Sequence, residues 1–259
     1  MGYFGLVFAL SVPFYLLGMA HLPFPGLLFL PLSALMTFVP MIAALFLAYR
    51  QGGRDAAAAL FGQVLDFRKL KGTVWPATAL LFIPAVCVIE FIVLRLNGSD
   101  LPLPQITLGK VVFLFAAFYV GAIGEELGWQ GLAYPGLRQR LSALEAALAL
   151  GAVWALWHVI PYALMGRSAN WIFWHSLNAV AMRVIIVWLF ENTRHSILVA
   201  VLFHTMINLS WALFPVEGSY YDPFVASLIL TISAVAVVCL WGPSTLALFR
   251  YDWKGGKDD

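Results

Sequence analysis

Charged residues are scarce in this sequence of 259 residues: Asp, Glu, Lys and Arg make up 11% of it, whereas soluble domains contain about 25%. Hydrophobic residues make up 62%, and the mean hydropathy is +0.88. No polar stretch is long enough to form a separate soluble domain. The composition therefore predicts a single polytopic membrane domain over residues 1–259.

Cysteine and basic clusters are also nearly absent. The two cysteines, Cys87 and Cys239, lie in apolar runs without CxxC spacing, so we expect buried packing thiols. The formal net charge is only +2, and the one basic cluster is Arg68, Lys69 and Lys71, which argues against a nucleic-acid partner. The chain shows no internal repeat, which argues weakly against transporters built from inverted repeats.

Long apolar runs dominate what is present. A transmembrane helix needs about 20 mostly apolar residues, and Pro, Gly and charged residues separate eight such runs. The predicted fold is an all-α integral membrane protein of about eight transmembrane helices enclosing a polar cavity. The first run has no basic stretch before it and is expected to be a span, not a cleaved signal peptide. The predicted spans are residues 3–20, 27–49, 73–96, 108–133, 143–163, 170–190, 196–214 and 224–242.

The distribution of basic residues predicts the orientation, because cytoplasmic loops carry an excess of Lys and Arg. With both termini in the cytoplasm, 11 of the 15 basic residues fall on the cytoplasmic side. The expected location is the cell (plasma) membrane of a prokaryote, as a multi-pass protein. These 11 residues are Arg50, Arg54, Arg68, Lys69, Lys71, Arg138, Arg140, Arg194, Arg250, Lys254 and Lys257.

Residues 55–71 follow the second predicted span and are rich in Ala and Leu before they become basic. This pattern is typical of an amphipathic helix on the membrane surface. An arm that docks substrate is the alternative interpretation of the same segment.

Two adjacent carboxylates, Glu125 and Glu126, lie near the end of the predicted span 108–133. A charged side chain at the centre of a span costs about 2.5–3.5 kcal/mol on insertion scales. The pair therefore implies a polar cavity, partner groups for the carboxylates, or protonation of one acid.

Two other predicted spans place polar residues at a similar depth. Trp154 and His158 are four residues apart, as are His204 and Asn208, so each pair shares a helix face. A rise of about 1.5 Å per residue puts Glu125, His158, His204 and Asn208 roughly 15–24 Å from the cytoplasmic ends of their helices. Three helices are thus expected to bring an acid, two imidazoles and an amide into one layer.

Structural roles are the alternative for several of these residues. We expect His175 to be a hydrogen-bonded packing residue, and the tryptophans at 154 and 157 to be mostly packing. Asn208 taken alone could be a hydrogen-bonding contact between helices. A purely structural role for Glu125, His158 and His204 together is much less expected, because they share one depth.

The layer has the groups that hydrolysis needs. A glutamate can take a proton from water, and imidazole and carboxamide donors can stabilise the resulting oxyanion. Alternatively, Glu125, His158 and His204 could hold a zinc ion with an open position for water. The sequence offers no better nucleophile: Ser176 and Ser210 lack an evident base, and HExxH is absent.

Three motifs carry a resemblance to a known family. They are Glu125-Glu126-x-x-x-Gln130, Trp154-x-x-x-His158 and His204-x-x-x-Asn208. They resemble the EExxxR, aromatic-xxx-His and HxxxN or HxxxD motifs of the CAAX-protease and bacteriocin-processing (CPBP, or Abi) family of intramembrane proteases. The resemblance covers roughly residues 108–214.

The resemblance implies an endopeptidase whose site opens toward the cytoplasm. Carried over, Glu125 activates water and His158 helps to hold it, while His204 and Asn208 stabilise the oxyanion and Glu126 is a structural or electrostatic partner. The implied substrate is a membrane-associated or lipidated (CAAX-type) peptide; bacteriocin processing or self-immunity is equally available. Family members have been described as metalloproteases and as glutamate-dependent proteases, so a divalent metal such as zinc stays open as the one possible cofactor.

The sequence departs from the family pattern at Gln130, where an arginine is usual. A neutral amide cannot balance the charge of Glu126. Arg183, inside the predicted span 170–190, is proposed to supply the missing charge. The alternative is that Arg183 pairs with Glu90 or extends its side chain toward the membrane surface.

Two functions of other classes remain open at this stage. The same polar layer could bind a proton or cation in a coupled membrane transporter. The chain could also be a catalytically silent membrane protein, for example one that confers bacteriocin immunity.

Overall fold

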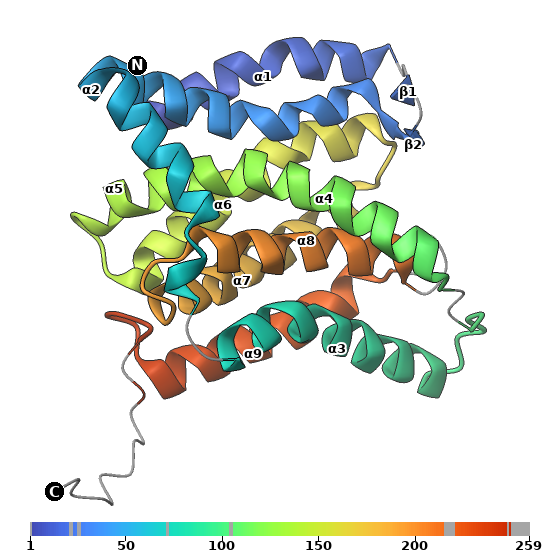
Figure 1. Cartoon of the computed structure of the whole chain (residues 1–259). Coiled ribbons are helices and arrows are strands. Elements are labelled where there is room, and N and C mark those ends of the chain that lie inside the picture. Colours follow the sequence, from blue (N-terminus) through green and yellow to red (C-terminus); the bar gives the residue numbers. More distant parts are fainter. Residues whose placement is uncertain are drawn as a thin grey trace, which may run out of the picture.

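The computed structural model of the chain describes residues 2–20, 23–24, 27–70, 73–103, 106–214, 221–247 and 249, with the backbone alone for 23–24 and 27–31. Helices form nearly all of this part of the chain and pack side by side (Figure 1). The α-helices are α1 (Tyr3–Met19), α2 (Val39–Gly62), α3 (Val74–Leu96), α4 (Leu108–Gly128), α5 (Tyr134–Arg138), α6 (Ala143–Leu164), α7 (Ala169–Glu191), α8 (Ile197–Leu213) and α9 (Pro223–Trp241).

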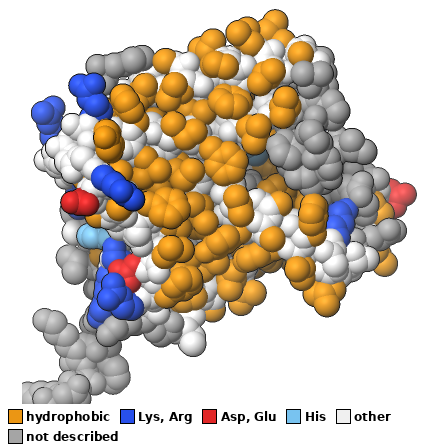
Figure 2. All heavy atoms as spheres, turned by 45° about the horizontal axis from the view of Figure 1, so that its top comes forward, with side chains coloured by type: hydrophobic (Ala, Val, Ile, Leu, Met, Phe, Trp, Pro, Cys, Tyr) orange, Lys and Arg blue, Asp and Glu red, His pale blue; other side chains and the backbone are white. Residues whose placement is uncertain are grey.

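The predicted membrane fold is confirmed. Within the described residues, six helical segments are long and apolar enough to cross a membrane, and α1 and α8 are shorter apolar helices. Figure 2 shows that hydrophobic side chains cover most of one face of the molecule, while most of the Lys and Arg visible there lie at one end of it. A surface of this kind suits a bilayer, because the apolar belt would meet water in a soluble protein.

The second predicted span, residues 27–49, begins differently from the prediction. A short antiparallel hairpin of β1 (Pro23–Phe24) and β2 (Leu27–Pro31) comes first, and the 3₁₀-helix η1 (Leu32–Phe38) leads into α2. Hydropathy alone cannot distinguish a short apolar strand from a helical turn. Pro40 lies in the first turn of α2, where its missing N–H costs no helical hydrogen bond.

The predicted surface segment 55–71 continues from α2. The helix is broken at Gly52 and Gly53, and Gly53 has a φ of 68°, a conformation that glycine adopts readily. Beyond the break, α2 runs to Gly62, and the 3₁₀-helices η2 (Gln63–Leu65) and η3 (Phe67–Lys69) follow. The position of this segment on the membrane surface stays a prediction.

The ends of the bundle bear on the predicted orientation. α1 begins and α9 ends toward the same end of the bundle (Figure 1), as an even number of crossings requires. Which end faces the cytoplasm stays a prediction. Four of the basic residues used for the prediction lie outside the described residues: Lys71, Arg250, Lys254 and Lys257.

The helix starts follow local sequence signals. Ser142 and Glu145 form a reciprocal capping box at α6, with the Ser142 Oγ accepting from the Glu145 N–H and the Glu145 carboxylate accepting from the Ser142 N–H. Ser168 caps α7, and Asp222 caps α9 with Pro223 as the first helical residue. These caps fix the points at which α6, α7 and α9 begin.

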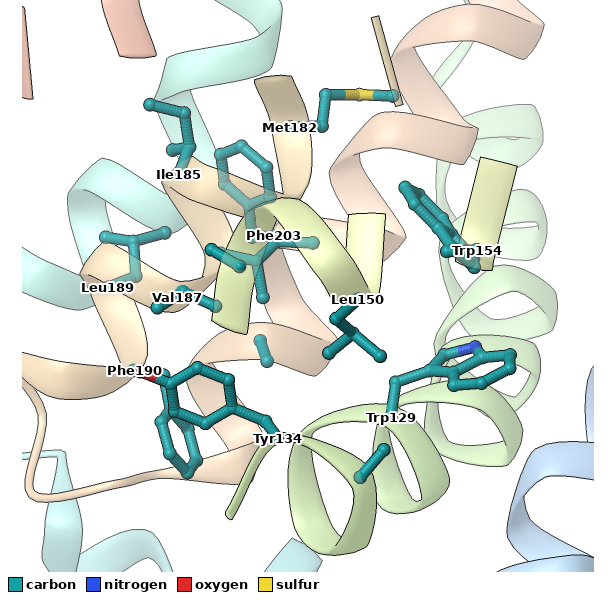
Figure 3. Close-up of a cluster of buried hydrophobic side chains, with 14 of the residues drawn as sticks. Trp129, Tyr134, Leu150, Trp154, Met182, Ile185, Val187, Leu189, Phe190 and Phe203 are labelled. Carbon is teal, nitrogen blue, oxygen red and sulfur yellow. The ribbon is translucent and has the colours of Figure 1, made fainter. Parts of the chain in front are cut away.

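The core is centred on α7, which packs against α6, α8 and α9. Figure 3 shows buried apolar side chains from α6, α7 and α8 meeting those of the segment that follows α4. Gly151 on α6 lets α7 come close, because a Cβ there would lie 3.1 Å from the Arg183 Cβ. Both cysteines are free; Cys87 is partly buried, but Cys239 is exposed on α9, so the expectation of a buried thiol is wrong there.

Candidate active site

Glycines bring the carboxylate-bearing turn of α4 against the start of α2. A Cβ at Gly128 would lie 2.4 Å from the Pro40 carbonyl oxygen, and one at Gly124 would lie 2.7 Å from the Thr37 carbonyl oxygen. Both positions therefore need the absence of a side chain. A π-helical turn, η4 (Trp129–Ala133), follows directly and re-aims the residues after the carboxylates.

Glu126 is fully buried and is neutralised from two sides. Arg183 on α7 donates from Nη1 to Oε2 at 2.7 Å and from Nη2 to Oε1 at 3.1 Å, which is a two-point ion pair. His204 on α8 contacts Oε1 through Nδ1 at 2.7 Å. The Glu126 carboxylate on α4 is thus hydrogen-bonded to side chains of both α7 and α8.

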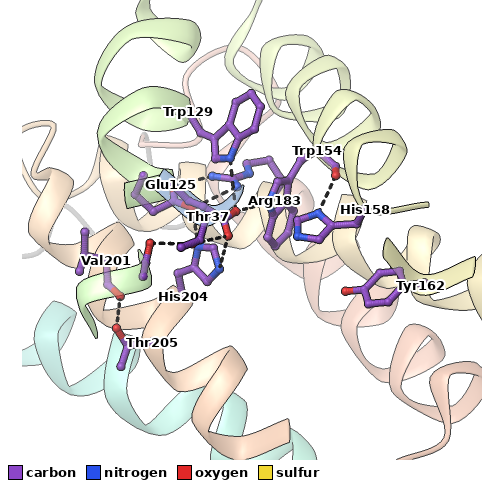
Figure 4. Close-up of polar contacts among 12 residues, drawn as sticks. Thr37, Glu125, Trp129, Trp154, His158, Tyr162, Arg183, Val201, His204 and Thr205 are labelled. Atoms are coloured by element: carbon purple, nitrogen blue, oxygen red, sulfur yellow. Dashed lines mark hydrogen bonds and ion pairs between the residues drawn. The ribbon is translucent and has the colours of Figure 1, made fainter. Parts of the chain in front are cut away.

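Glu125 has different partners on each of its two oxygens (Figure 4). Oε2 accepts from the indole N–H of Trp154 at 2.8 Å and from that of Trp129 at 3.4 Å. Oε1 lies 3.2 Å from the Thr37 hydroxyl and 4.0 Å from His204 Nε2. Glu125 is only 6% exposed, so its side chain points into the bundle and not toward lipid.

His204 lies between the two carboxylates, with one ring nitrogen toward each. The Glu126 carboxylate, paired with Arg183, accepts hydrogen bonds, so His204 Nδ1 carries the donated proton. His204 Nε2 then faces Glu125. This arrangement fixes both the orientation and the tautomer of the imidazole.

His158 is oriented by its own helix. Its Nδ1 lies 2.9 Å from the Trp154 carbonyl oxygen, which can only accept, so Nε2 of the neutral ring is left as the acceptor. The ring stacks on Tyr162 and meets Trp157 edge-on. His158 is partly exposed, unlike the two carboxylates.

Trp154 contacts four residues of the site, which the sequence did not predict: Glu125, Arg183, His204 and His158. Besides its hydrogen bond to Glu125, its ring lies 4.5 Å from the Arg183 guanidinium and meets the His204 and His158 rings edge-on at 5.3 and 5.5 Å. Trp154 and Trp157 both pack in the buried core, as expected, and Trp154 has these polar contacts in addition. The motif spacing could not reveal the contact, because it joins residues 29 positions apart.

The segment that carries these site residues is similar to a known protein family. The family model described as type II CAAX prenyl endopeptidase Rce1-like matches residues 107–210. Residues 107–210 are therefore similar to this family. The match confirms the resemblance to the CPBP family over the segment that carries all three motifs.

A curated relative matches over a similar length. It is CAAX prenyl protease 2 of Methanococcus maripaludis, 28% identical over 99 residues, which cover 35% of this chain and 36% of the relative. The chain therefore spans about a third of the length of the curated relative that it matches.

The departure from the CPBP pattern at Gln130 has a structural explanation. Gln130 is fully buried, and its amide has no hydrogen-bond partner among the described residues. Arg183 pairs with Glu126 as predicted. The alternative pairing with Glu90 is wrong, since a Glu90 oxygen instead accepts the Asp222 backbone N–H.

Asn208 is the residue of the CPBP pattern that the structure does not bring into contact with the others. It lies one turn after His204 on α8 and is partly buried, but among the described residues it has no recorded hydrogen bond. Its predicted part in the site stays a prediction. His175 is the hydrogen-bonded packing residue that was expected, held between the hydroxyls of Tyr162 and Tyr221.

The sequence also predicted a possible metal site and a polar cavity around the three motifs. Among the described residues, no three His, Cys, Asp or Glu side chains are placed to share one ion, so Glu125, His158 and His204 do not fit a metal as they stand. Two hollows of about 550 Å³ lie elsewhere, one beside residues 59–68 and one beside Trp171 and Tyr221. The polar cavity around the three motifs stays a prediction.

Proposed function

We propose that the protein is an intramembrane endopeptidase that hydrolyses peptide bonds in membrane-associated or lipidated, CAAX-type peptides. One observation carries the proposal: a buried glutamate lies 4.0 Å from an imidazole whose other nitrogen contacts a second, ion-paired glutamate. Such a group is costly inside a membrane and has no packing role that an apolar residue could not fill. The family match over residues 107–210 supports the same activity.

In the proposed reaction, Glu125 is the general base. Its Oε1 takes a proton from a water molecule while the water oxygen attacks the scissile carbonyl carbon. The water is held by His158, whose Nε2 accepts its second hydrogen. The protonated Glu125 then gives its proton to the leaving amine, so that one water is consumed and the carboxylate is restored.

The oxyanion of the tetrahedral intermediate needs donors. His204 in its doubly protonated form would donate from Nε2, with its positive charge balanced by Glu126, and the Asn208 amide would supply a second donor. Arg183 does not touch the substrate in this scheme. It keeps Glu126 ionised and in place, and Glu126 in turn orients His204.

The proposed substrate class follows from the surroundings and from the relative. The relative's name describes a prenyl protease, and a lipid group would hold a peptide at the bilayer in which this site lies. The proposed location is the cell membrane, with the site reached from the cytoplasm. Apart from the peptide and the membrane lipids, the scheme needs no other partner.

The test is cleavage of a fluorogenic peptide with a C-terminal CAAX sequence by the purified protein in lipid vesicles, with and without a prenyl group on its cysteine. Wild-type protein is expected to cut the prenylated peptide, and Glu125→Gln to cut it at a rate at least about 100-fold lower. Glu145→Gln is the matched control, because Glu145 is an exposed capping residue of α6. No cleavage by the wild type, or full activity in Glu125→Gln, would refute the proposal.

A further inference from the structure

We propose that Trp154 is a positioning residue whose indole N–H determines which oxygen of Glu125 acts as the base. The inference rests on the proposed function, since it concerns the same glutamate. The 2.8 Å bond from Trp154 Nε1 to Glu125 Oε2 is the shortest of the hydrogen bonds that the described residues make to this carboxylate.

The two carboxylate oxygens are not equivalent. Oε2 receives two indole N–H groups, from Trp154 and from Trp129 at 3.4 Å. These donors occupy lone pairs of Oε2, so a water molecule has less room to donate a hydrogen bond to that oxygen. Oε1 faces His204 and Thr37 instead, and so it is the oxygen left to accept a proton from water.

Thr37 strengthens this assignment. Its hydroxyl has one proton and two acceptors within reach, the Gly121 carbonyl oxygen at 3.1 Å and Glu125 Oε1 at 3.2 Å. When the proton goes to Gly121, no described residue donates a direct hydrogen bond to Oε1, since His204 Nε2 lies 4.0 Å away. Thr37 can therefore release Oε1 for water, whereas each indole has only one N–H and no other acceptor recorded.

The Trp154 ring is itself fixed in place. It is 4% exposed, and the Arg183 guanidinium lies 4.5 Å from its centroid on one side while the His204 ring meets it edge-on. A ring fixed in this way cannot rotate its N–H away from Glu125 without breaking these contacts. The motif resemblance asks only for an aromatic residue here, and tryptophan alone among aromatics combines this ring size with an N–H.

The test compares two variants that each lose one short hydrogen bond to a glutamate. Trp154→Phe keeps an aromatic ring and removes the N–H from Glu125. Tyr134→Phe is the matched control, because the fully buried Tyr134 on α5 donates to Glu191 Oε1, at the end of α7, at 2.6 Å. Both variants keep an aromatic ring and lose one hydrogen bond to a carboxylate, so both should lower thermal stability to a similar extent.

The readout is kcat and KM separately, on the prenylated peptide in vesicles. Trp154→Phe is expected to lower kcat about tenfold to hundredfold, the range for loss of one hydrogen bond to a charged group, with KM within about twofold. Tyr134→Phe should keep kcat within about threefold. A kcat for Trp154→Phe equal to that of Tyr134→Phe, or an effect confined to KM, would overturn the assignment.

A third variant keeps the test decisive if Trp154→Phe does not fold. Trp129→Phe removes the longer of the two bonds to Oε2 and is expected to lower kcat by a smaller factor, with KM unchanged. An unchanged kcat in that variant would then overturn the proposal. Absence of peptidase activity in the wild type is a separate result, which refutes the proposed function itself.

Discussion

At the scale of single residues, burial determines how much a charged side chain contributes to stability. Arg183 and Glu126 are both fully buried and joined by two hydrogen bonds, whereas Arg167 lies exposed above the Trp171 ring. Removing one partner of a buried ion pair costs about 3–5 kcal/mol, because the other charge is left uncompensated. An exposed cation over an aromatic ring contributes about 0.5–1 kcal/mol.

Replacing Arg183 by leucine should therefore destabilise the protein by about 3–5 kcal/mol and abolish peptidase activity. Arg167→Leu should cost no more than about 1 kcal/mol and keep the activity. Thermal unfolding in detergent and the vesicle assay measure both effects. Equal tolerance of the two substitutions would show that Arg183 does not serve Glu126.

The sequence predicted this pairing but not its surroundings. A buried arginine needs an anionic partner. Glu126 needs a cationic partner, because Gln130 stands where the family pattern has an arginine. The pairing of Arg183 with Glu126 could therefore be predicted from the sequence alone. The indole bond from Trp154 to Glu125 could not be foreseen, because it depends on how α4 and α6 are rotated against each other. The spacing of residues in the sequence shows which side chains share a face of one helix. It does not show how two helices are rotated relative to each other.

At the scale of elements, the close approach of α4 to the start of α2 holds the carboxylates in place. Gly128 has no room for a Cβ, since the Pro40 carbonyl oxygen and the Tyr3 hydroxyl occupy that space. Gly136, on α5, has no atom within 4 Å of the same position. Gly128 is therefore required for the close packing of α4 on α2, whereas a side chain at Gly136 would fit without a clash.

Gly128→Ala is expected to push α4 away from α2, costing about 1–3 kcal/mol as overpacking does, and to reduce activity by displacing Glu125. Gly136→Ala should leave stability unchanged or raise it slightly, because alanine favours a helix over glycine by about 1 kcal/mol. Thermal unfolding midpoints distinguish them. Similar midpoints for both variants would contradict the packing account.

Element boundaries show where sequence patterns are sufficient. The predicted spans 73–96, 170–190 and 224–242 agree closely with α3, α7 and α9, because long apolar runs end at caps or charges. The hairpin before η1 was missed, since it is a short apolar run without helical or alternating periodicity. The π-turn after Gly128 was missed as well, because no residue pattern marks it.

At the scale of the whole molecule, orientation is the open prediction. It rests on the excess of basic residues at one end of the bundle and can be tested by cysteine labelling in intact cells, after Cys87 and Cys239 are replaced by alanine. A cysteine at exposed Arg140 should react with an impermeant maleimide only after permeabilisation, and one at exposed Asn97 should react before it. The reverse labelling pattern would show that the protein has the opposite orientation in the membrane and that the site does not open toward the cytoplasm.

Metal dependence is the second property of the whole molecule that can be measured. Because no three ligand side chains are placed around one point in the described part of the chain, cleavage is expected to survive dialysis against a strong chelator. The assay compares kcat before dialysis, after it, and after zinc is added back. Loss of activity restored by zinc would mean that Glu125, His158 and His204 rearrange around an ion.

The central claim is that Glu125 activates a water molecule inside the membrane. The most direct measurement is peptide cleavage in ¹⁸O-labelled water under single-turnover conditions, by wild type and by Glu125→Gln. The account predicts one ¹⁸O atom in the new carboxylate for the wild type. It also predicts a rate about 100-fold to 10,000-fold lower for the variant, as expected when a general base is removed. Cleavage by Glu125→Gln at the wild-type rate, or a product without the label, would contradict it.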